Sequence, residues 1–325
     1  MNTANVTIHA SQFPENVRRD LLASLATRRV NHKFHYDSIR QTQKWLALHE
    51  AHSPARTDTD CLDTYDLAFN AMPARIQAEK IHVLGLGCGG GQKDTRLLKL
   101  LSVAGRELSY TPSDVSVAMT LVARHAALTV IPDGRCFPFV CDLATADDLP
   151  AIMDARETAG TSRLVTFFGM IPNFEPEAIL PKLAGLVRPP DFLLFSANLS
   201  PGADYAEGMR TIFSQYDNVL THDWLLAFLL DLGLERSDGD LRFTIENGAE
   251  GLSRVEAQFH FTRDCRLAVD AEEFHFKAGE TMRLFFSYRY TPALVRSHLA
   301  RHGLTVCAEW VASSQEEGVF LCRRS

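Results

Sequence analysis

The sequence predicts an α/β fold with a mainly parallel sheet, because short runs of β-forming residues alternate with helical segments from residue 81 onward. The strand-like runs lie at 81–87, 107–114, 137–143, 163–170 and 191–199. The helical patterns between them lie at 93–104, 117–128 and 176–187. A glycine-rich stretch directly after the first run and an acidic residue at the end of the second run agree with this prediction.

The rest of the chain predicts a second, α+β lobe. Residues 14–30 and 36–50 have helical spacing, and residues 201–290 combine an apolar helix with alternating strand-like runs. The last segment returns to the sheet as a helix and two strands. We therefore predict a sheet domain of residues 60–200 plus 291–325, and a substrate or lid lobe of residues 1–59 plus 201–290.

Composition narrows the class of protein. Of the 325 residues, 46% are hydrophobic and 22% charged, which is typical of a globular enzyme. The formal net charge of -7 gives no electrostatic reason to expect nucleic acid or an anionic membrane as a partner. Seven cysteines without a CxxC pair favour reduced thiols and predict no metal site. We expect a cytoplasmic enzyme whose only partner is a small molecule.

The glycine-rich stretch, residues 83–93, reads VLGLGCGGGQK. Without Cβ atoms, Gly85, Gly87 and Gly89 allow a tight turn and a close approach to a ligand. The absence of a GK[ST] motif disfavours a phosphate-binding P-loop. A tight strand–helix turn without any ligand is the structural alternative.

Two carboxylates follow at the ends of the next strands. Asp114 comes about twenty residues after the glycines, where an acidic residue can accept hydrogen bonds from both ribose hydroxyls. Asp142 follows the third strand, where it can accept a hydrogen bond from an adenine amino group. The glycine-rich stretch, Asp114 and Asp142 thus follow three consecutive strands in this order. Together they predict an adenosine pocket, with NAD as a less favoured ligand.

Six short motifs resemble those of the histidine-specific methyltransferases that depend on S-adenosylmethionine (SAM), the family that makes the trimethylhistidine precursor of ergothioneine. They are Lys33-Phe34-His35-Tyr36-Asp37, residues 53–58, Gly87-x-Gly89-x-x-x-Lys93, Tyr110-x-Pro112-x-Asp114-x-Ser116, residues 169–174, and Gly279-Glu280 followed by Ser287-x-x-Tyr290. The resemblance implies a class I methyltransferase fold with a Rossmann-like sheet, which normally closes with an antiparallel hairpin such as residues 304–325 predict.

The resemblance also implies roles for individual residues. The SAM-binding residues would be Gly87, Gly89, Lys93, Asp114, Asp142 and Leu143, and Tyr36 would close over the methionyl end of SAM. Asn173 and Tyr216 match positions that hold the α-amino and α-carboxylate groups of an amino-acid substrate. Asn173 could instead cap the helix that follows it.

The chain departs from the family where the substrate ring is held. The family carries a Thr-Glu-x-Ser run whose Glu and Ser bind imidazole, whereas this chain has Phe285 at the Glu position and keeps Ser287. A family tyrosine that helps to bind substrate falls at His52. A phenyl ring cannot accept a hydrogen bond from imidazole, so histidine is a poor substrate candidate.

Two activities remain open, both with SAM and without a metal. In the first, SAM cyclises to azetidine-2-carboxylic acid and releases methylthioadenosine, as in some relatives of this family. Aromatic walls from Phe285, Phe286, Phe167 and Phe168 would then hold the sulfonium by cation–π attraction. In the second, the enzyme methylates the nitrogen of an amino acid other than histidine. Cyclisation is preferred because polar recognition is lost without a visible replacement.

Two readings oppose these assignments. The phenylalanines could simply form the core of the lobe, which is their usual fate. The protein could also be a catalytically silent SAM-binding regulator. Asn173 and Tyr216 argue against a regulator, because a sensor has no need of residues that hold a substrate.

Overall fold

The computed structural model of the protein describes residues 3–52, 58–157, 160–248 and 251–325. Its chain divides into two compact units. The first, called the sheet unit here, comprises residues 1–12, 59–199 and 290–325; the second, called the lobe, comprises residues 13–58 and 200–289. Because the chain leaves and re-enters the sheet unit twice, the lobe is built from two separate segments.

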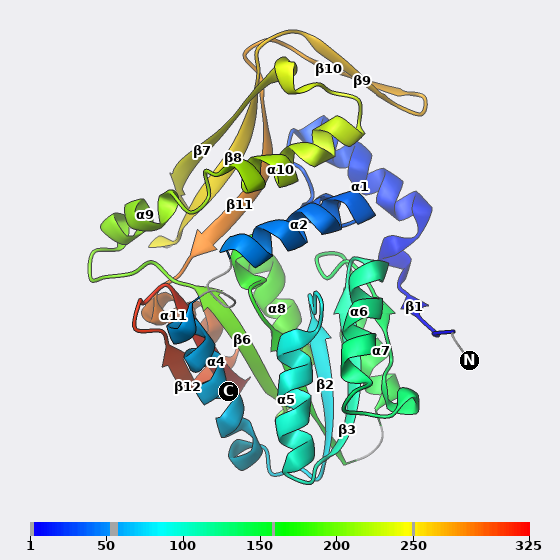
Figure 1. Ribbon diagram of the computed structural model, residues 1–325, viewed down its shortest axis with the longest axis vertical. Helices are drawn as coiled ribbons and strands as arrows, with labels where there is room; N and C mark the ends of the chain where they lie inside the picture. The colour runs from blue at the N-terminus through cyan, green and yellow to red at the C-terminus, as the bar shows by residue number, and fades with distance from the viewer. Residues whose placement is uncertain (1–2, 53–57, 158–159, 249–250) are drawn as a thin grey trace. The chain divides into compact units, whose positions relative to one another are not determined.

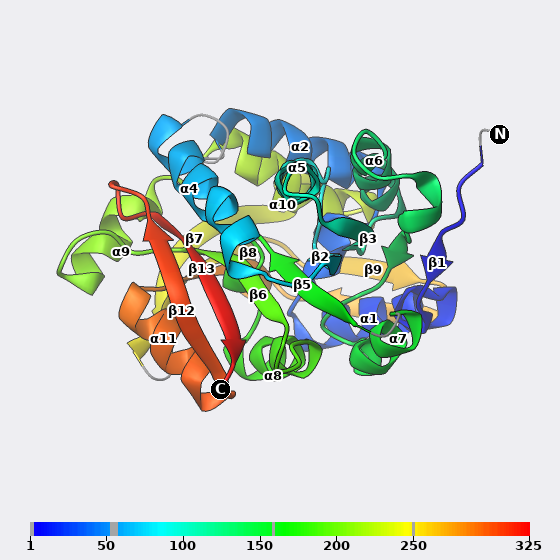
Figure 2. The same cartoon turned by 90° about the horizontal axis from the view of Figure 1, so that it is seen from below.

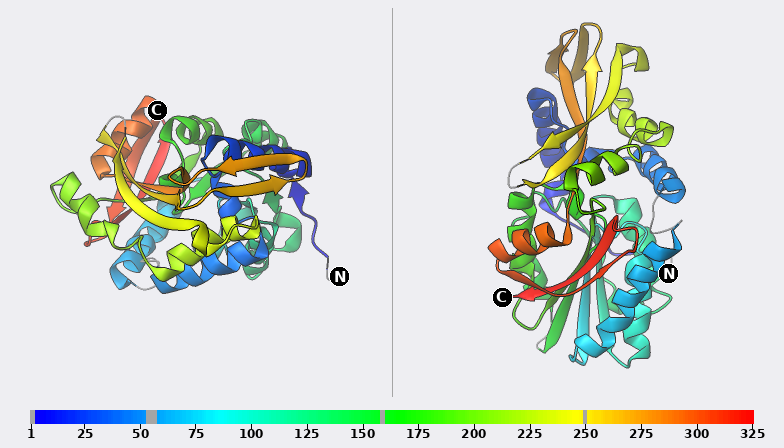
Figure 3. Two further views of the ribbon diagram at one scale, coloured as in Figure 1. Left: turned by 90° about the horizontal axis from the view of Figure 1, so that it is seen from above. Right: turned by 90° about the vertical axis from the view of Figure 1, so that its left-hand side faces the viewer.

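An eight-stranded sheet forms the centre of the sheet unit, in the order β1-β4-β3-β2-β5-β6-β13-β12 (Figure 1). Its strands are β1 (Thr7–Ile8), β2 (Lys80–Leu86), β3 (Glu107–Asp114), β4 (Phe139–Val140), β5 (Thr161–Phe167), β6 (Phe192–Asn198), β12 (Leu304–Val311) and β13 (Glu317–Arg324). The six strands from β1 to β6 pair in parallel, and the β12–β13 hairpin adds to β6 in antiparallel fashion (Figure 3). The α/β prediction and the closing hairpin are confirmed.

Helices cover both faces of this sheet (Figure 2). One face carries α4 (Thr59–Arg75), α5 (Gln92–Val103) and α6 (Val117–Ala127); the other carries α7 (Leu149–Arg156), α8 (Pro176–Leu186) and α11 (Pro292–Arg301). The sequence analysis did not predict α4. Its buried side chains recur at helical spacing, at Cys61, Tyr65, Ala68, Phe69 and Met72, although the helix begins in a polar stretch.

The N-terminus differs from the predicted domain boundary. Residues 1–12 were assigned to the lobe, but Thr7 and Ile8 pair in parallel with Phe139 and Val140 at the sheet edge. Backbone hydrogen bonds of this short strand therefore hold the N-terminal segment in the sheet unit. The predicted strand 137–143 is in fact only two residues long.

The lobe contains helices and antiparallel strands (Figure 1). Its helices are α1 (Pro14–Thr27), α2 (Ile39–His52), α9 (Tyr205–Phe213) and α10 (Val219–Asp231), with the short 3₁₀ helix η2 at His32–His35. Its strands are β7 (Gly239–Asn247), β8 (Ser253–Phe261), β9 (Cys265–Val269), β10 (Glu272–Phe276) and β11 (Thr281–Arg289). The order β11-β8-β7 forms one sheet, and β9 and β10 form a separate ribbon.

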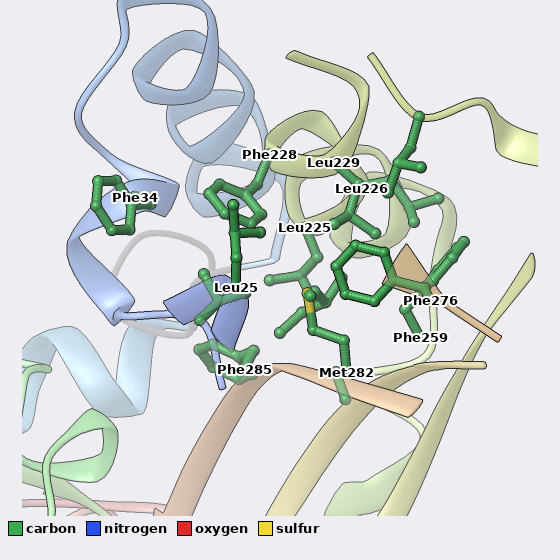
Figure 4. Packing of buried hydrophobic residues seen from close by; sticks show 14 of the residues in the cluster. Leu25, Phe34, Leu225, Leu226, Phe228, Leu229, Phe259, Phe276, Met282 and Phe285 are labelled. Carbon is green, nitrogen blue, oxygen red and sulfur yellow. The ribbon is translucent and has the colours of Figure 1, made fainter. Parts of the chain in front are cut away.

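One apolar cluster joins the helices of the lobe to its strands (Figure 4). Leu25 of α1, Phe34 of η2, and Leu225 and Phe228 of α10 pack with Phe285 of β11. All of these side chains are buried. The N-terminal helices therefore pack on α10 and the strands of the lobe, and a smaller cluster of Met209, Ile212 and Val255 joins α9 to β8.

Within the described residues, no helix is long and apolar enough to cross a membrane. The same residues contain no group of three or more His, Cys, Asp or Glu side chains that could hold a metal ion.

A buried carboxylate connects α5 to three strands of the large sheet. Asp94, only 3% exposed, accepts hydrogen bonds from Tyr110 Oη of β3 at 2.6 Å and from Thr166 Oγ1 of β5 at 2.7 Å. Burial raises the pKa of Asp94, and these two hydrogen bonds oppose that rise. Gly85 of β2 lies against the carboxylate, so close that a Cβ atom there would overlap with Asp94 Oδ2.

We predict that Gly85→Ala lowers the free energy of unfolding by about 1–3 kcal/mol, because the added methyl group must displace a carboxylate that two hydrogen bonds hold. Gly134→Ala is the matched control, since a Cβ at Gly134 meets open space. Urea unfolding of both variants measures the difference. Equal stability of the two would contradict the close packing of Asp94 under β2.

Candidate functional site

The predicted ligand-binding residues of the sheet unit, three nucleotide-binding positions and the substrate-binding Asn173, lie where the parallel strands of the large sheet end. The glycine loop follows β2, Asp114 ends β3, Asp142 follows β4, and Asn173 follows β5 in a 3₁₀ turn. The order β4-β3-β2-β5 places these four positions side by side along that edge. Ligands of open α/β sheets bind at this edge.

Backbone geometry explains the glycines. Gly87 and Gly89 have φ angles of 59° and 51°, in the left-handed region that side chains rarely adopt. A Cβ on Gly87 would also meet the side chain of Met170, and one on Gly91 would meet the backbone of Ala123 in α6. The loop therefore runs close to its neighbours in a tight turn that leads into α5.

Asp114 shapes this loop. Its two carboxylate oxygens accept hydrogen bonds from the amides of Gly89 and Ser116, each at 3.0 Å. Burial raises the pKa of Asp114, and the backbone hydrogen bonds of Ser116, Gly89 and Val115 oppose the rise. A carboxylate has about four acceptor positions, so lone pairs remain for a ribose.

Lys93, in the first turn of α5, belongs to a buried polar network. Its Nζ donates a hydrogen bond to Tyr65 Oη at 2.7 Å and lies 3.9 Å from the centre of the Tyr65 ring. Tyr65 in turn donates to the carboxylate of Glu317 in β13 and lies 2.8 Å from Ser196 Oγ. Burial and Glu317 raise the pKa of Tyr65 well above 10, so it stays a phenol. Three elements thus hold Lys93 beside the glycine loop.

Asp142 and Leu143 follow β4 and are both buried. The Asp142 amide donates to Ser11 Oγ at 2.9 Å, and its Oδ1 accepts from the Ala144 amide at 2.9 Å. Ser11 belongs to the N-terminal segment beside β1. Through this hydrogen bond, the N-terminal segment fixes the backbone of Asp142, a predicted adenine-binding residue.

In the lobe, Phe285 lies within a cluster of rings. The centre of its ring is 5.5 Å from that of Trp224 in α10 and 5.7 Å from that of His32 in η2. Tyr36 lies 5.1 Å from His32 and 5.6 Å from Trp224 by the same measure. Phe285 itself is 8% exposed, so most of its surface is core, as the structural alternative stated.

Both histidines of this cluster are neutral. Burial and the neighbouring His35 lower the pKa of His32 to about 3, and burial lowers the pKa of His35 to about 4. His35 Nε2 donates to the carbonyl of Leu284 at 2.6 Å, which fixes its tautomer. Around neutral pH these two rings therefore add no positive charge beside Phe285.

Ser287 and Tyr216 also meet within the lobe. Tyr216, between α9 and α10, donates from its Oη to Ser287 Oγ at 2.9 Å. Arg289 Nε donates to the same Tyr216 Oη at 3.0 Å, and its terminal nitrogen donates to Gln215 Oε1 at 3.3 Å. Ser287 and Arg289 are 2% and 5% exposed, whereas Tyr216 is half-buried and Gln215 is exposed.

Two phenylalanines do not lie where the cyclisation hypothesis placed them. Phe167 is fully buried in β5 and packs on Phe174, so it belongs to the core of the sheet unit. Phe286 points to the opposite face of β11 from Phe285, because side chains alternate along a strand, and the guanidiniums of Arg254 and Arg283 lie over its ring. Phe168 is half-buried beside Tyr65 and Phe69.

For two further predicted positions, the structure gives the location but does not test the predicted role. Asn173 is half-buried at the end of its 3₁₀ turn, and its amide donates to the Met170 carbonyl. His52 is exposed as the last residue of α2. The motif at 53–58 lies outside the described residues except for Asp58.

Sequence reasoning missed Asp94, Tyr65, Trp224, His32 and Arg289. A signal existed for two of them. Asp94 is the one acidic side chain on the buried stripe formed by Leu97, Leu98 and Leu101, and Arg289 continues the alternation of Phe285 and Ser287. The others are brought to their neighbours by tertiary contacts alone.

These residues suit a SAM-type ligand. Gly87 and Gly89 turn the loop at positive φ angles without a side chain, and Asp114 retains acceptor capacity. When bound, SAM would supply an electrophilic carbon on a sulfonium. Gly87, Gly89, Asp114, Asp142 and Leu143 are the residues predicted to hold its nucleoside, with Lys93 beside them.

The description "Histidine-specific methyltransferase, SAM-dependent" belongs to a family model that matches residues 17–324. No curated protein matches the chain in sequence. Among the solved structures that are similar in fold are two methyltransferases. Magnesium protoporphyrin IX methyltransferase (ChlM) from Synechocystis PCC 6803, with bound SAH, is 13% identical, with a TM-score of 0.50, and the match covers 90% of this chain and 98% of that one.

The second is a putative methyltransferase from Thermobifida fusca YX, which is 8% identical with a TM-score of 0.50. The match covers 90% of this chain and 94% of that one. At such identities the likeness concerns the fold alone, and it confirms the predicted class I methyltransferase architecture.

We predict that Asp114→Ala weakens SAM binding at least 100-fold, since two hydrogen bonds to a charged acceptor contribute about 3–6 kcal/mol. The same change also releases the Gly89 amide, so loop order and affinity fall together. Asp191→Ala is the control, because Asp191 is a buried carboxylate that accepts from the Arg163 amide at the start of β6. Calorimetry should find weaker SAM binding for the first variant only.

We predict that His35→Gln reduces the loss of stability in acid. The folded-state pKa of His35, about 4, lies below its unfolded value, so the unfolded chain binds an extra proton between those pH values. Stability is complete above about pH 6.5 and falls by ~1.4 kcal/mol per pH unit for each such histidine as the pH drops toward 4. Glutamine can still donate to Leu284.

Urea unfolding of the His35→Gln variant from pH 7 to pH 4.5, followed by tryptophan fluorescence, tests this slope. His125→Gln changes an exposed histidine of α6 and serves as the control. An unchanged slope in the His35→Gln variant would show that His35 titrates alike in both states.

Proposed function

Since this chain belongs to the SAM-dependent, histidine-specific methyltransferase family, we propose that it converts SAM without methylating histidine, by cyclising it to azetidine-2-carboxylic acid and methylthioadenosine. The observation that carries the proposal is the surroundings of Phe285, which takes the position of the family's ring-binding carboxylate. Trp224, His32 and Tyr36 pack around that position, and both nearby histidines are neutral at pH 7.

Such a cluster suits a sulfonium better than an imidazole. Aromatic faces attract a cation by about 1–2 kcal/mol when water is excluded. Imidazole, in contrast, needs an acceptor for its N–H, and the phenyl ring of Phe285 provides none. The cationic residue of η2 is Lys33, whose Nζ lies 2.6 Å from a carboxylate oxygen of Asp20. This ion pair compensates the positive charge of Lys33.

The reaction forms one bond and breaks one. The unprotonated α-amine of SAM attacks its own γ-carbon, the carbon–sulfur bond breaks, and the electron pair leaves with sulfur as neutral methylthioadenosine. The α-ammonium group of SAM gives its proton to solvent before this attack, and the azetidinium nitrogen then keeps the positive charge that sulfur has lost. The work left to the protein is to fold the methionyl chain and exclude water, which is a proximity effect. Asn173 and Tyr216 are the residues proposed to orient its amine and carboxylate.

N-methylation of an amino acid other than histidine is the second candidate. The observation that favours it is the pair of rings from Tyr36 and Trp224, because they would also suit the apolar side chain of an amino-acid acceptor. Its products would be S-adenosylhomocysteine and a methylated amino acid.

We predict that the purified protein with SAM alone gives azetidine-2-carboxylate and methylthioadenosine by mass spectrometry. Phe285→Leu should slow this about tenfold, because the aromatic face is lost. Phe286→Leu, on the opposite face of the same strand, should have no effect. Phe285→Glu should impair cyclisation more strongly by favouring a protonated amine.

The competing activities give different products. Intact SAM that yields S-adenosylhomocysteine only after an amino acid is added would replace cyclisation by N-methylation. Trimethylhistidine formed from SAM and histidine would show that the argument from Phe285 is wrong. No turnover under either condition would favour the silent regulator.

A further inference from the structure

The β4–α7 loop, residues 142–148, contains both predicted adenine-binding residues of this edge, and side chains from the N-terminal segment hold its two ends. At one end, Ser11 Oγ accepts a hydrogen bond from the Asp142 amide at 2.9 Å. At the other, His9 Nε2 lies 2.9 Å from Asp148 Oδ1. Because Ser11 Oγ also lies 2.9 Å from His9 Nδ1, the two ends of the loop are joined through two side chains.

The direction of these hydrogen bonds follows from the backbone. The Ser11 amide donates to His9 Nδ1 at 3.1 Å, and an amide can only donate. Nδ1 is therefore an acceptor, and the ring proton lies on Nε2, which donates it to Asp148. Ser11 Oγ accepts from the Asp142 amide and donates its own proton to His9 Nδ1. The hydrogen bonds thus run one way, from Asp142 through Ser11 and His9 to Asp148.

The N-terminal segment is itself fixed to the sheet. Its strand β1 pairs in parallel with β4, and the His9 amide continues this pairing with a hydrogen bond of 2.9 Å to the Val140 carbonyl. Ser11 is 6% exposed, so bulk water competes little for its hydroxyl. The match to the family model begins at residue 17, so His9 and Ser11 belong to a part of the chain that the model does not cover.

Other contacts hold the loop less firmly. It borders a pocket of about 200 Å³ whose lining comes from the loop, α7 and α8 and includes Leu143, Ala146, Leu149, Pro181 and Leu186. Side chains beside such a space lack van der Waals partners on that side. Lys182 of α8 also pairs with Asp147, but at the surface, where an ion pair contributes little. The buried hydrogen bond to Ser11 is therefore well suited to fix the backbone at Asp142.

We propose that Ser11, oriented by His9, is a positioning residue that sets the preference of the nucleoside site for adenine. Asp142 is predicted to accept from the adenine amino group. A carboxylate has about four acceptor positions, more than the Ala144 amide uses at Oδ1. Without the Ser11 hydroxyl, the buried Asp142 amide loses its acceptor, and the carboxylate shifts with its backbone. The proposal rests on the proposed use of SAM, whose nucleoside is adenosine.

The test compares S-adenosylhomocysteine with S-inosylhomocysteine, in which a carbonyl oxygen replaces the adenine amino group. That oxygen cannot donate to Asp142, so calorimetry on the full-length protein should find the adenosine ligand bound at least about tenfold more tightly. Ser11→Ala should reduce this ratio to about threefold or less, and Ser11→Thr, which keeps the hydroxyl, should retain it. Lys182→Gln removes the surface ion pair of the same loop and is the matched control, with the wild-type ratio expected.

Two variants of His9 test the direction of the hydrogen bonds. In His9→Asn, the side-chain oxygen can replace Nδ1 as the acceptor for Ser11, whereas the amide nitrogen of His9→Gln can replace only Nε2 beside Asp148. His9→Asn should therefore keep most of the adenine preference, and His9→Gln should lose it. The reverse result would show that the contact with Asp148, and not Ser11, controls the loop, and the proposal would be wrong.

A purely structural role gives a different outcome. If Ser11→Ala weakens both ligands by the same factor, or if wild-type protein binds both equally, the proposal is overturned. Urea unfolding of each variant measures stability separately from the ratio. Cyclisation is judged from the products that wild-type protein forms from SAM, whereas binding of the two homocysteine ligands requires no turnover. Either idea can therefore fail alone.

Discussion

The carboxylate of Asp94 is buried beneath the glycine loop, and the nucleotide side of the site depends on it. It accepts from side chains of β3 and β5 and lies against Gly85 of β2, so one residue of α5 fixes the helix over three strands. Charge-assisted hydrogen bonds in a buried setting tolerate little displacement. The start of α5 is therefore fixed, and with it the tight turn of Gly87–Gly91 and the position of Lys93.

From that fixed point, other polar ties extend along the same edge of the sheet. Asp114 holds the loop amide of Gly89, Tyr65 and Glu317 hold Lys93, and Ser11 holds the backbone at Asp142. Each tie joins residues far apart in sequence. A site made this way is pre-organised, because its side chains have partners before any ligand arrives.

The lobe is organised by a different device. Alternation along β11 sends Phe285, Ser287 and Arg289 to one face and Phe286 and Tyr288 to the other. The inward face changes from aromatic to hydroxyl to cationic within five residues.

The sequence by itself determined the fold class, the closing hairpin and the order of the glycine loop, Asp114 and Asp142 along the chain. It could do so because the spacing of hydrophobic residues and the turn residues between elements are local features of the sequence. It also identified the family. It did not reveal α4, the pairing of Thr7–Ile8 with β4, or the opposite facing of Phe285 and Phe286. Only the tertiary structure decided these, together with the neutral state of His32 and His35 and the hydrogen bonds that Tyr216 makes with Arg289 and Ser287. Burial, pairing and hydrogen-bond direction depend on neighbours that the chain brings together only when it folds.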